Sequence, residues 1–118
     1  MAVILIAGAI PDLPALLPSM LRNEGHDIHI MTNHSKLWAA IALLRPALIL
    51  IDEGMKTHSG KKFCRDIKQN KSTQHIAVIL LSVDAAFAGH ADDIIKRPFD
   101  TKEFRDIIIR TLEKYNIT

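Results

Sequence analysis

Asp52, Ser82 and Arg97 are the residues of this chain best placed for chemistry, because each comes at or just after the end of a short apolar segment. A carboxylate, a hydroxyl and a guanidinium can together bind a phosphoryl group or another anion. The carboxylate can also contribute to a metal site if further acids lie close to it. A third arrangement is a permanent ion pair of Asp52 with Lys56 or with Arg97, whose planar, always charged group suits such a pair well.

The segment predicted to lie beside Asp52 supplies no further acids. The first apolar segment of the chain is followed by Gly8 and Ala9, whose side chains cannot bind a cation. Glu53 cannot simply replace such acids, because successive side chains of a strand point to opposite faces. An ion pair with Arg97 would also leave Asp52 with little net charge to attract a divalent cation. We therefore expect no cofactor, and we expect Mg²⁺ to bind weakly or not at all.

Short apolar segments alternate with helical patterns along the chain, which is typical of an α/β fold. Several of the apolar segments have no polar face, as expected for a parallel sheet that helices cover on both sides. Ligands of such doubly wound sheets bind at the carboxyl ends of the strands. Strands are predicted at residues 3–7, 28–32, 48–52, 78–82 and 94–96, and helices at residues 12–23, 35–44, 61–69 and 101–114.

Two segments depart from this pattern. Pro18 lies inside the first predicted helix, where it would cost about 3 kcal/mol unless the helix bends or begins late. Residues 83–93 form a short connection between the last two strands, close to the minimum of about 10–12 residues for a crossover that contains a helix. We therefore expect a kinked or late first helix, and a fourth crossover helix that is shortened or missing.

Length and composition indicate a single domain, residues 1–118, in the cytoplasm. The 118 residues are 48% hydrophobic and carry a formal net charge of +2, too small by itself to indicate nucleic acid binding. Cys64 is the only cysteine, so no internal disulfide can form, which suits a reducing compartment. The apolar N-terminal segment is too short to span a bilayer and lacks the basic residues of a signal peptide.

Five segments together resemble the response regulator receiver domain, the CheY-like domain of two-component signalling. They are residues 48–52, Gly60, residues 78–82, residues 91–93 and residues 97–100, and they follow one another in the order found in that family. The resemblance covers nearly the whole chain. It implies a flavodoxin-like, doubly wound, five-stranded parallel sheet with strand order 2-1-3-4-5, and a role in phosphorelay signal transduction.

The resemblance also implies roles for individual residues. Asp52 matches the aspartate that accepts a phosphoryl group from a histidine kinase, and Ser82 matches the hydroxyl that hydrogen-bonds the phosphoryl oxygens. Arg97, with Lys96 before it, matches the lysine that contacts the phosphate. Pro98 matches the proline that follows this lysine, and the sequence allows either isomer of its peptide bond.

Other positions depart from the family. The acid pair that binds magnesium falls on Gly8 and Ala9, and the aromatic switch residue of the last strand falls on Ile94. The proline and the aspartate of the loop after the phosphoacceptor fall on Lys56 and Ser59. These departures predict a degenerate member of the family, a pseudo-receiver.

Three functions remain open. The first is a degenerate receiver that acts mainly as a protein-interaction module, with weak or no Mg²⁺-dependent phosphorylation and no enzymatic activity. The second is a functional receiver that a histidine kinase phosphorylates at Asp52. The third is a small α/β domain that binds a nucleotide or another anion near Gly8, Ser82 and Arg97.

The expected partners are proteins: a histidine kinase, a phosphotransfer protein or another signalling protein, with neither a membrane nor nucleic acid. A homodimer through the last strand and the last helix is a further arrangement. Trp38 and Ile109 lie off the apolar stripes of their helices, so we expect both to be partly exposed. A basic cluster on and after the third helix is typical of a solvated face but could dock an acidic partner; its members are Lys61, Lys62, Arg65, Lys68 and Lys71.

Histidine and cysteine form no predicted site. No two histidines have the spacing of a metal-binding helix pair, so we expect scattered surface side chains. Cys64 follows Phe63 on a helical stripe, which indicates packing and not a nucleophile. The histidines are His26, His29, His34, His58, His75 and His90.

Overall fold

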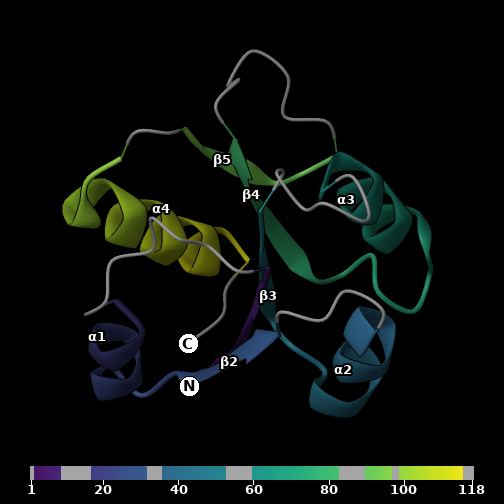
Figure 1. Cartoon of the computed structure of the whole chain (residues 1–118), viewed down its shortest axis with the longest axis horizontal. Coiled ribbons are helices and arrows are strands. Elements are labelled where there is room, and N and C mark those ends of the chain that lie inside the picture. The colour runs from purple at the N-terminus through teal and green to yellow at the C-terminus, as the bar shows by residue number, and fades with distance from the viewer. Residues whose placement is uncertain are drawn as a thin grey trace.

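A five-stranded parallel sheet forms the centre of the molecule, and helices cover both of its faces (Figure 1). The computed structural model describes residues 2–8, 17–31, 36–52, 60–82, 90–96 and 99–115. The predicted α/β fold is confirmed. Along the described residues, no helix is long and apolar enough to cross a membrane.

The strands lie in the order β2-β1-β3-β4-β5, as predicted, and every neighbouring pair is parallel. Each residue of β3 and of β4 is buried, because these central strands have neighbours on both sides and helices on both faces. This explains why both sequences are apolar almost throughout. The bounds are β1 Val3–Ala7, β2 Asp27–Met31, β3 Leu48–Asp52, β4 Ala77–Ser82 and β5 Asp93–Lys96.

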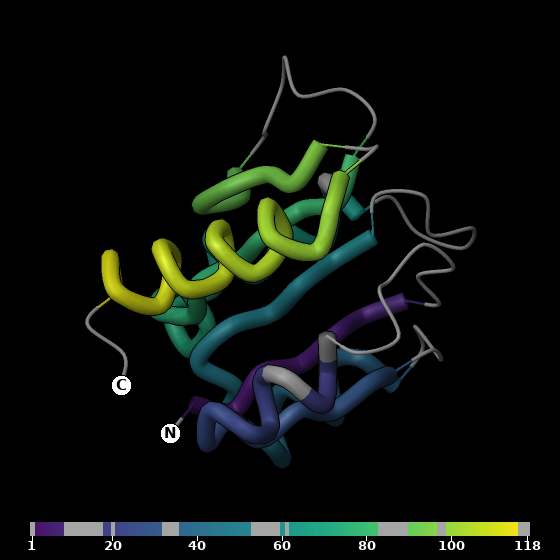
Figure 2. Tube along the Cα trace, turned by 90° about the vertical axis from the view of Figure 1, so that its left-hand side faces the viewer, coloured from purple at the N-terminus to yellow at the C-terminus, as the bar shows by residue number. Residues whose placement is uncertain are grey.

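Among the described residues, two helices lie on each face of the sheet. Helices α1 (Leu17–Asn23) and α4 (Thr101–Lys114) cover one face, which is turned toward the viewer in Figure 2. Helices α2 (Leu37–Leu44) and α3 (Gly60–Gln69) cover the other. The described helices match the predicted ones to within one or two residues, apart from the start of the first.

Each face has its own apolar core, because alternate residues of a strand point to opposite sides. An apolar stripe of α4 packs against one side of β3 and β4, and its members are Phe104, Ile108 and Leu112. Apolar stripes of α2 and α3 pack against the other side, and their buried members are Leu37, Ile41, Phe63, Cys64 and Ile67. Cys64 is therefore a packing residue, as expected.

Local signals explain where two of the helices begin and end. The Asp100 carboxylate accepts a hydrogen bond from the Glu103 N–H at 2.7 Å, a cap that satisfies one of the free donors at the start of α4. Helix α2 ends at Arg45, whose φ of 48° is left-handed, and Pro46 cannot continue the helix. Pro18 lies in the first turn of the described part of α1, where its missing N–H is not needed.

The fourth crossover is only partly described. Residues 90–92 form no helix and lead directly into β5, while residues 83–89 lie outside the described residues, as do residues 12–16 before α1. The shortened or missing helix at this crossover therefore stays a prediction.

Candidate functional site

The carboxyl ends of the strands bring two of the predicted site residues together. Asp52 ends β3 and is paired with Leu81 of β4, so Ser82 lies one residue further along the neighbouring strand. Ser82 is in turn paired with Lys96 at the end of β5. Because all strands are parallel, these three residues share one edge of the sheet, as the sequence predicted.

Both polar side chains at this edge are buried by the fold. Asp52 has 8% of its surface exposed and Ser82 has 1%. The central position of β3 in the sheet accounts for this burial, since β1 and β4 flank it. Lys96, at the end of the edge strand β5, is exposed.

Gly8 occupies the place beside Asp52. Ala7 is paired with Ile51 in the β1–β3 ladder, so Gly8 follows at the level of Asp52. Its N–H donates to the Met31 carbonyl at 2.9 Å, and its φ is 116°. Side chains rarely tolerate this conformation, so glycine fits the position for a backbone reason.

The residues described at this edge do not fit a magnesium site. Mg²⁺ prefers several oxygen ligands, whereas Gly8 offers no side chain beside the single carboxylate of Asp52. Within the described part of the chain, no three His, Cys, Asp or Glu side chains lie close enough to hold a metal ion. The expected weak magnesium binding itself stays a prediction.

Several predicted site residues cannot be placed. Arg97 lies outside the described residues, so the proposed ion pair with Asp52 stays a prediction, as does the isomer of the peptide bond before Pro98. The other positions without a description are Ala9, Glu53, Lys56, Ser59, His34 and His58.

Ile94 lies in β5, at the position matched to the family's aromatic switch. Its side chain is half-buried and packs against the core beneath α2 and α3. A branched aliphatic side chain in such a place has no ring that could turn between an inward and an outward position. Trp38 and Ile109 are partly exposed, as predicted.

A cluster that the sequence did not predict lies at the opposite edge of the sheet. The Lys68 ammonium of α3 donates to the Ile76 carbonyl at 2.9 Å and to both Asp92 Oδ2 and Tyr115 Oη at 3.1 Å. The Tyr115 hydroxyl donates to Asp92 Oδ1, and the Val78 N–H donates to Asp92 Oδ2 at 2.8 Å. The cluster therefore joins α3, β4, the approach to β5 and the end of α4.

Protonation of this cluster is coupled to its geometry. Burial alone would lower the pKa of Lys68, but its hydrogen bonds to Tyr115 and Asp92 outweigh burial and raise this pKa above its ordinary value of 10.5. Burial and the hydrogen bond to Asp92 raise the pKa of Tyr115 above 10.0.

Lys68 thus corrects one expectation. It was grouped with a solvated basic face, but its side chain is only 17% exposed and it makes an ion pair with Asp92. No local pattern in the sequence indicated this, because its partners Asp92 and Tyr115 are distant along the chain.

The match to known proteins is consistent with this geometry. Residues 4–109 match the response regulator receiver domain. The DNA-binding response regulator MtrA of Mycolicibacterium smegmatis is 29% identical over 107 residues, which cover 85% of this chain and 46% of that protein. A histidine kinase of Formosa agariphila is 35% identical over 97 residues, which cover 75% of this chain and 7% of the kinase. The chain thus spans less than half the length of these relatives.

Solved structures show the same fold. The chemotaxis response regulator CheY4 of Vibrio cholerae superposes with a TM-score of 0.80 at 16% identity, covering 95% of this chain and 99% of that one. The receiver domain of a signal transduction histidine kinase from Syntrophus aciditrophicus gives a TM-score of 0.82 at 26% identity, covering 97% and 92% of the two chains. With nearly the whole sequence matched and the sheet order shared, the chain belongs to the receiver domain family of two-component signalling.

Proposed function

We propose that this receiver domain works in the cytoplasm mainly through protein contacts, with weak or no magnesium-dependent phosphorylation of Asp52 and no enzymatic activity of its own. The observation that supports this most is Gly8, which lies beside Asp52 where the family resemblance places an acid. The chain belongs to the receiver domain family whether or not Asp52 is phosphorylated.

The physical argument rests on charge. Phosphoryl transfer places negative charge on the transferring oxygens, and a metal held by carboxylates normally compensates it. Asp52 alone provides one negative charge for a dication, and Gly8 cannot add a second. A cation bound this weakly would be rarely present when a phosphoryl donor arrives.

The backbone adds a second obstacle. At φ 116°, an aspartate in place of Gly8 would be strained, so the missing ligand cannot return by a single substitution without a local change of the chain. The backbone conformation at Gly8 therefore disfavours an acid beside Asp52.

Signal transmission would also need another route. With Ile94 packed against the core beneath α2 and α3, no ring is present in β5 to respond to a group bound near Ser82. Binding of a partner to a surface of the domain requires no such rearrangement.

A titration with beryllofluoride, which mimics a phosphoryl group, tests the proposal. We expect the amide NMR signals of Asp52, Ser82 and Gly8 to stay unchanged when beryllofluoride and millimolar Mg²⁺ are added together. Asp52→Asn serves as the control, because it removes the acceptor and leaves the size of the side chain unchanged. Saturable shifts in the wild type that vanish in Asp52→Asn would contradict the proposal.

One alternative has support of its own. Asp52 is retained at the end of β3, buried beside Ser82, which is what a functional phosphoacceptor would require. The saturable shifts described above, together with an acid-stable, base-labile phosphoryl group on Asp52 after incubation with a kinase, would favour this alternative.

The partners follow from the family. We propose a histidine kinase, a phosphotransfer protein or another signalling protein, since receiver domains occur both in a DNA-binding regulator and in a histidine kinase among the relatives. A homodimer through β5 and α4 is a separate proposal. Sedimentation over a wide concentration range tests it directly.

A further inference from the structure

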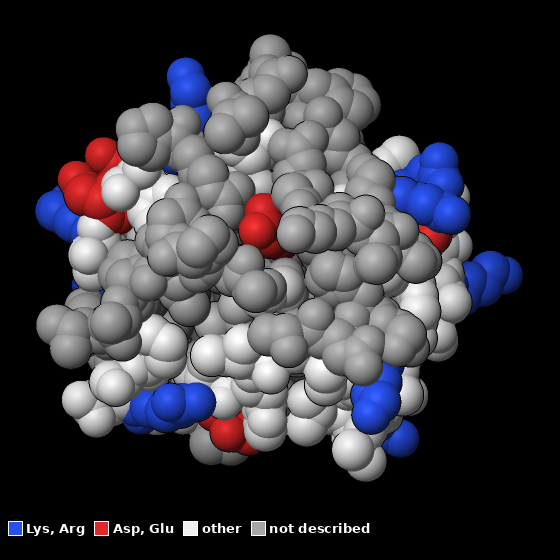
Figure 3. Space-filling view, viewed as in Figure 1, with Lys and Arg blue, Asp and Glu red and all other residues white. Residues whose placement is uncertain are grey.

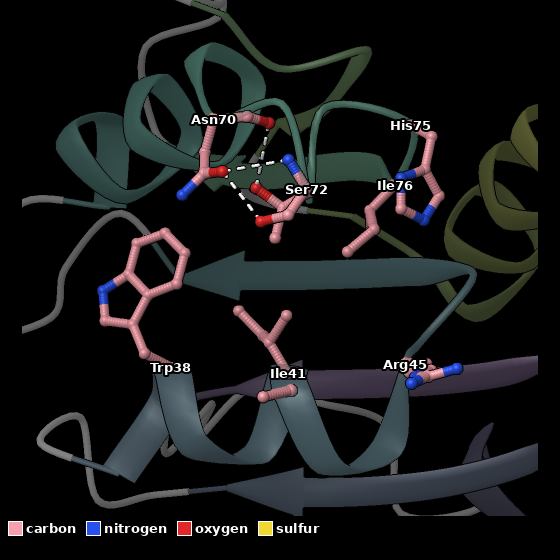
Figure 4. A pocket seen from close by; sticks show the side chains of 9 residues that line it. Trp38, Ile41, Arg45, Asn70, Ser72, His75 and Ile76 are labelled. Atoms are coloured by element: carbon pink, nitrogen blue, oxygen red, sulfur yellow. Dashed lines mark hydrogen bonds between the residues drawn. The ribbon is translucent and has the colours of Figure 1, made fainter.

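A pocket of about 510 Å³ lies between α2 and the turn that joins α3 to β4 (Figure 4). Its lining does not include Asp52, Ser82 or Gly8. Its volume is in the range of ligand-binding pockets, about 300–1,000 Å³. Ile41 of α2 and Ile76 before β4 provide an apolar surface in it. Nothing in the proposed function uses this pocket.

The two ends of the pocket differ in chemistry. Trp38 lies at one end, 39% exposed, with its ring centroid 6.3 Å from that of Phe63. Arg45 lies at the other end on the α2 wall, and His75 lies at the same end on the opposite wall, as Figure 4 shows. The Arg45 side chain has no hydrogen-bond or ion-pair partner among the described residues.

The walls are held in place without a ligand. On the far side from α2, Asn70 Oδ1 accepts hydrogen bonds from the Ser72 N–H at 3.0 Å and from the Ser72 hydroxyl at 2.8 Å. The Thr73 hydroxyl donates to the Ile67 carbonyl at 2.7 Å, which ties the turn to α3. A preformed wall lowers the entropic cost of binding.

The surface around the pocket is basic. In Figure 3, Lys and Arg side chains gather at the right-hand side, over α2 and α3, with little acidic surface between them. Asp66 is the one acid that the structure describes on these two helices, and it pairs with Arg65 at 3.6 Å. The exposed cations of this face, in α2, α3 and the residues that flank them, are Lys36, Arg45, Lys62, Arg65 and Lys71.

Several basic side chains of the opposite face are paired with acids. On the α1–α4 side, each of three basic residues has an acid within hydrogen-bond distance: Arg105 bonds Glu24, Arg110 bonds Asp93 and Lys102 bonds Asp106. The α2–α3 side leaves most of its positive charge without such compensation among the described residues. A surface of this kind favours an acidic partner.

We propose that the α2–α3 groove docks an acidic, extended segment of another protein, which places an apolar side chain against Trp38 and a carboxylate at Arg45. Arg45 follows Trp38 by seven positions, which corresponds to about 10 Å along the helix at 1.5 Å per residue. An extended chain covers this distance in about three residues.

A peptide fits this groove better than nucleic acid does. A nucleic acid backbone would match the positive charge, but its phosphates would gain nothing from the apolar end of the pocket, where Trp38 is 39% exposed. A small anion would match the pocket but would leave the outer cations, such as Lys62 and Lys71, without a partner. This docking surface is independent of the proposed function, and its failure would leave that function untouched.

Trp38 is the only tryptophan of the chain, so its fluorescence reports on the groove directly. The probe is a short synthetic peptide of Asp and Glu residues with one central leucine. We expect a saturable change of Trp38 emission, with a dissociation constant in the micromolar to millimolar range that rises with salt concentration.

Two variants that each remove one positive charge provide the comparison. Arg45→Gln should weaken peptide binding about five- to tenfold, whereas Lys114→Gln, on the exposed side of α4, should change it less than twofold. Both side chains are exposed, so neither change threatens the fold, and melting temperatures verify this. Labelled peptide and fluorescence anisotropy extend the test to Trp38→Ala, for which we expect a similar loss.

Several results would overturn the proposal. It fails if no binding is seen at millimolar peptide, or if the two charge variants bind equally. It also fails if an acidic peptide without leucine, or a single-stranded oligonucleotide of equal charge, binds as tightly, because the surface would then attract any polyanion. Self-association that Arg45→Gln abolishes would assign the groove to a second copy of the chain instead.

Discussion

The two edges of the sheet differ in the charged groups that they bring together. At the carboxyl edge, Asp52 lies beside a glycine, and no metal-binding group of acids gathers there among the described residues. At the amino edge, Asp92 receives hydrogen bonds from a lysine, a tyrosine and a backbone N–H. The carboxyl edge is where sheets of this kind bind ligands. The hydrogen bonds at the amino edge instead join separate elements of the fold.

This difference shows where the fold depends on ionic interactions. A buried carboxylate is tolerated when partners satisfy its oxygens, and it is costly when they do not. The cluster of Lys68, Asp92 and Tyr115 meets this condition and also joins elements that are distant in sequence. We therefore expect substitutions in this cluster at the amino edge to lower stability.

Removal of the Asp92 carboxylate should have the largest effect. Asp92→Ala leaves the Lys68 ammonium, only 17% exposed, without its ion-pair partner, and it removes the carboxylate that accepts from the Val78 N–H. We expect a loss of about 2–4 kcal/mol in the free energy of unfolding, measured by urea denaturation.

Asp106→Ala is the matched control for this change. Its carboxylate pairs with Lys102 one helical turn away, on the exposed surface of α4. Such an exposed pair contributes far less to stability than a buried one, because solvent screens it. Equal losses in the two variants would show that the amino-edge cluster has no special role in stability.

Alkaline pH should weaken the same cluster. The pKa values of Lys68 and Tyr115 are both raised, so the folded state holds these two protons more tightly than the unfolded state does. The stability that they contribute is fully present below pH 10.0, the ordinary pKa of tyrosine, and is lost as the pH rises through the raised values.

Urea denaturation from about pH 9 to pH 11 measures this loss. The double variant Lys68→Met/Tyr115→Phe removes both titrating groups, so its stability should fall less steeply than that of the wild type over this interval. Parallel curves for the two proteins would rule out the cluster as the source of the alkaline loss.

The contrast between the edges also shows what the sequence could predict. The strand order was implied by the family resemblance. The helices, the strands and their buried faces followed from apolar patterning, because both kinds of element bury side chains at regular spacing. Asp52 and Ser82 were placed correctly at one edge for the same reason. The Lys68 cluster was missed because its members are 24 and 23 residues apart along the chain and meet only through the sheet topology.

Gly8 marks another limit of sequence reasoning. Its identity showed that an acid is missing, but the φ of 116° that explains the glycine is a property of the folded backbone. The chemistry of the pocket between α2 and the α3–β4 turn likewise depends on residues from two separate segments. Exposure of Trp38 was predictable from the helical stripe, whereas the position of Arg45 at the far end of the groove was not.

Loss of a single hydroxyl should have a smaller effect than loss of the carboxylate. Tyr115→Phe removes the donor to Asp92 and the acceptor of Lys68 but keeps the ring, over which the ammonium lies 5.4 Å from the centroid. We expect a loss of about 1 kcal/mol in the free energy of unfolding. Urea denaturation at neutral pH tests this, and an unchanged stability would mean that the ring, and not the hydroxyl, holds the end of α4.

The smallest effect is expected at the carboxyl edge. Addition of 10 mM Mg²⁺ should leave the melting temperature unchanged, because Asp52 and Gly8 provide too few ligands. A site with a dissociation constant of about 1 mM would add about 1.4 kcal/mol by mass action, which corresponds to a rise of several degrees. A rise that disappears in Asp52→Asn would reveal a magnesium site at this edge and reverse the contrast between the two edges. A rise that persists in Asp52→Asn would place the ion elsewhere and leave the contrast intact, so the variant decides between the two.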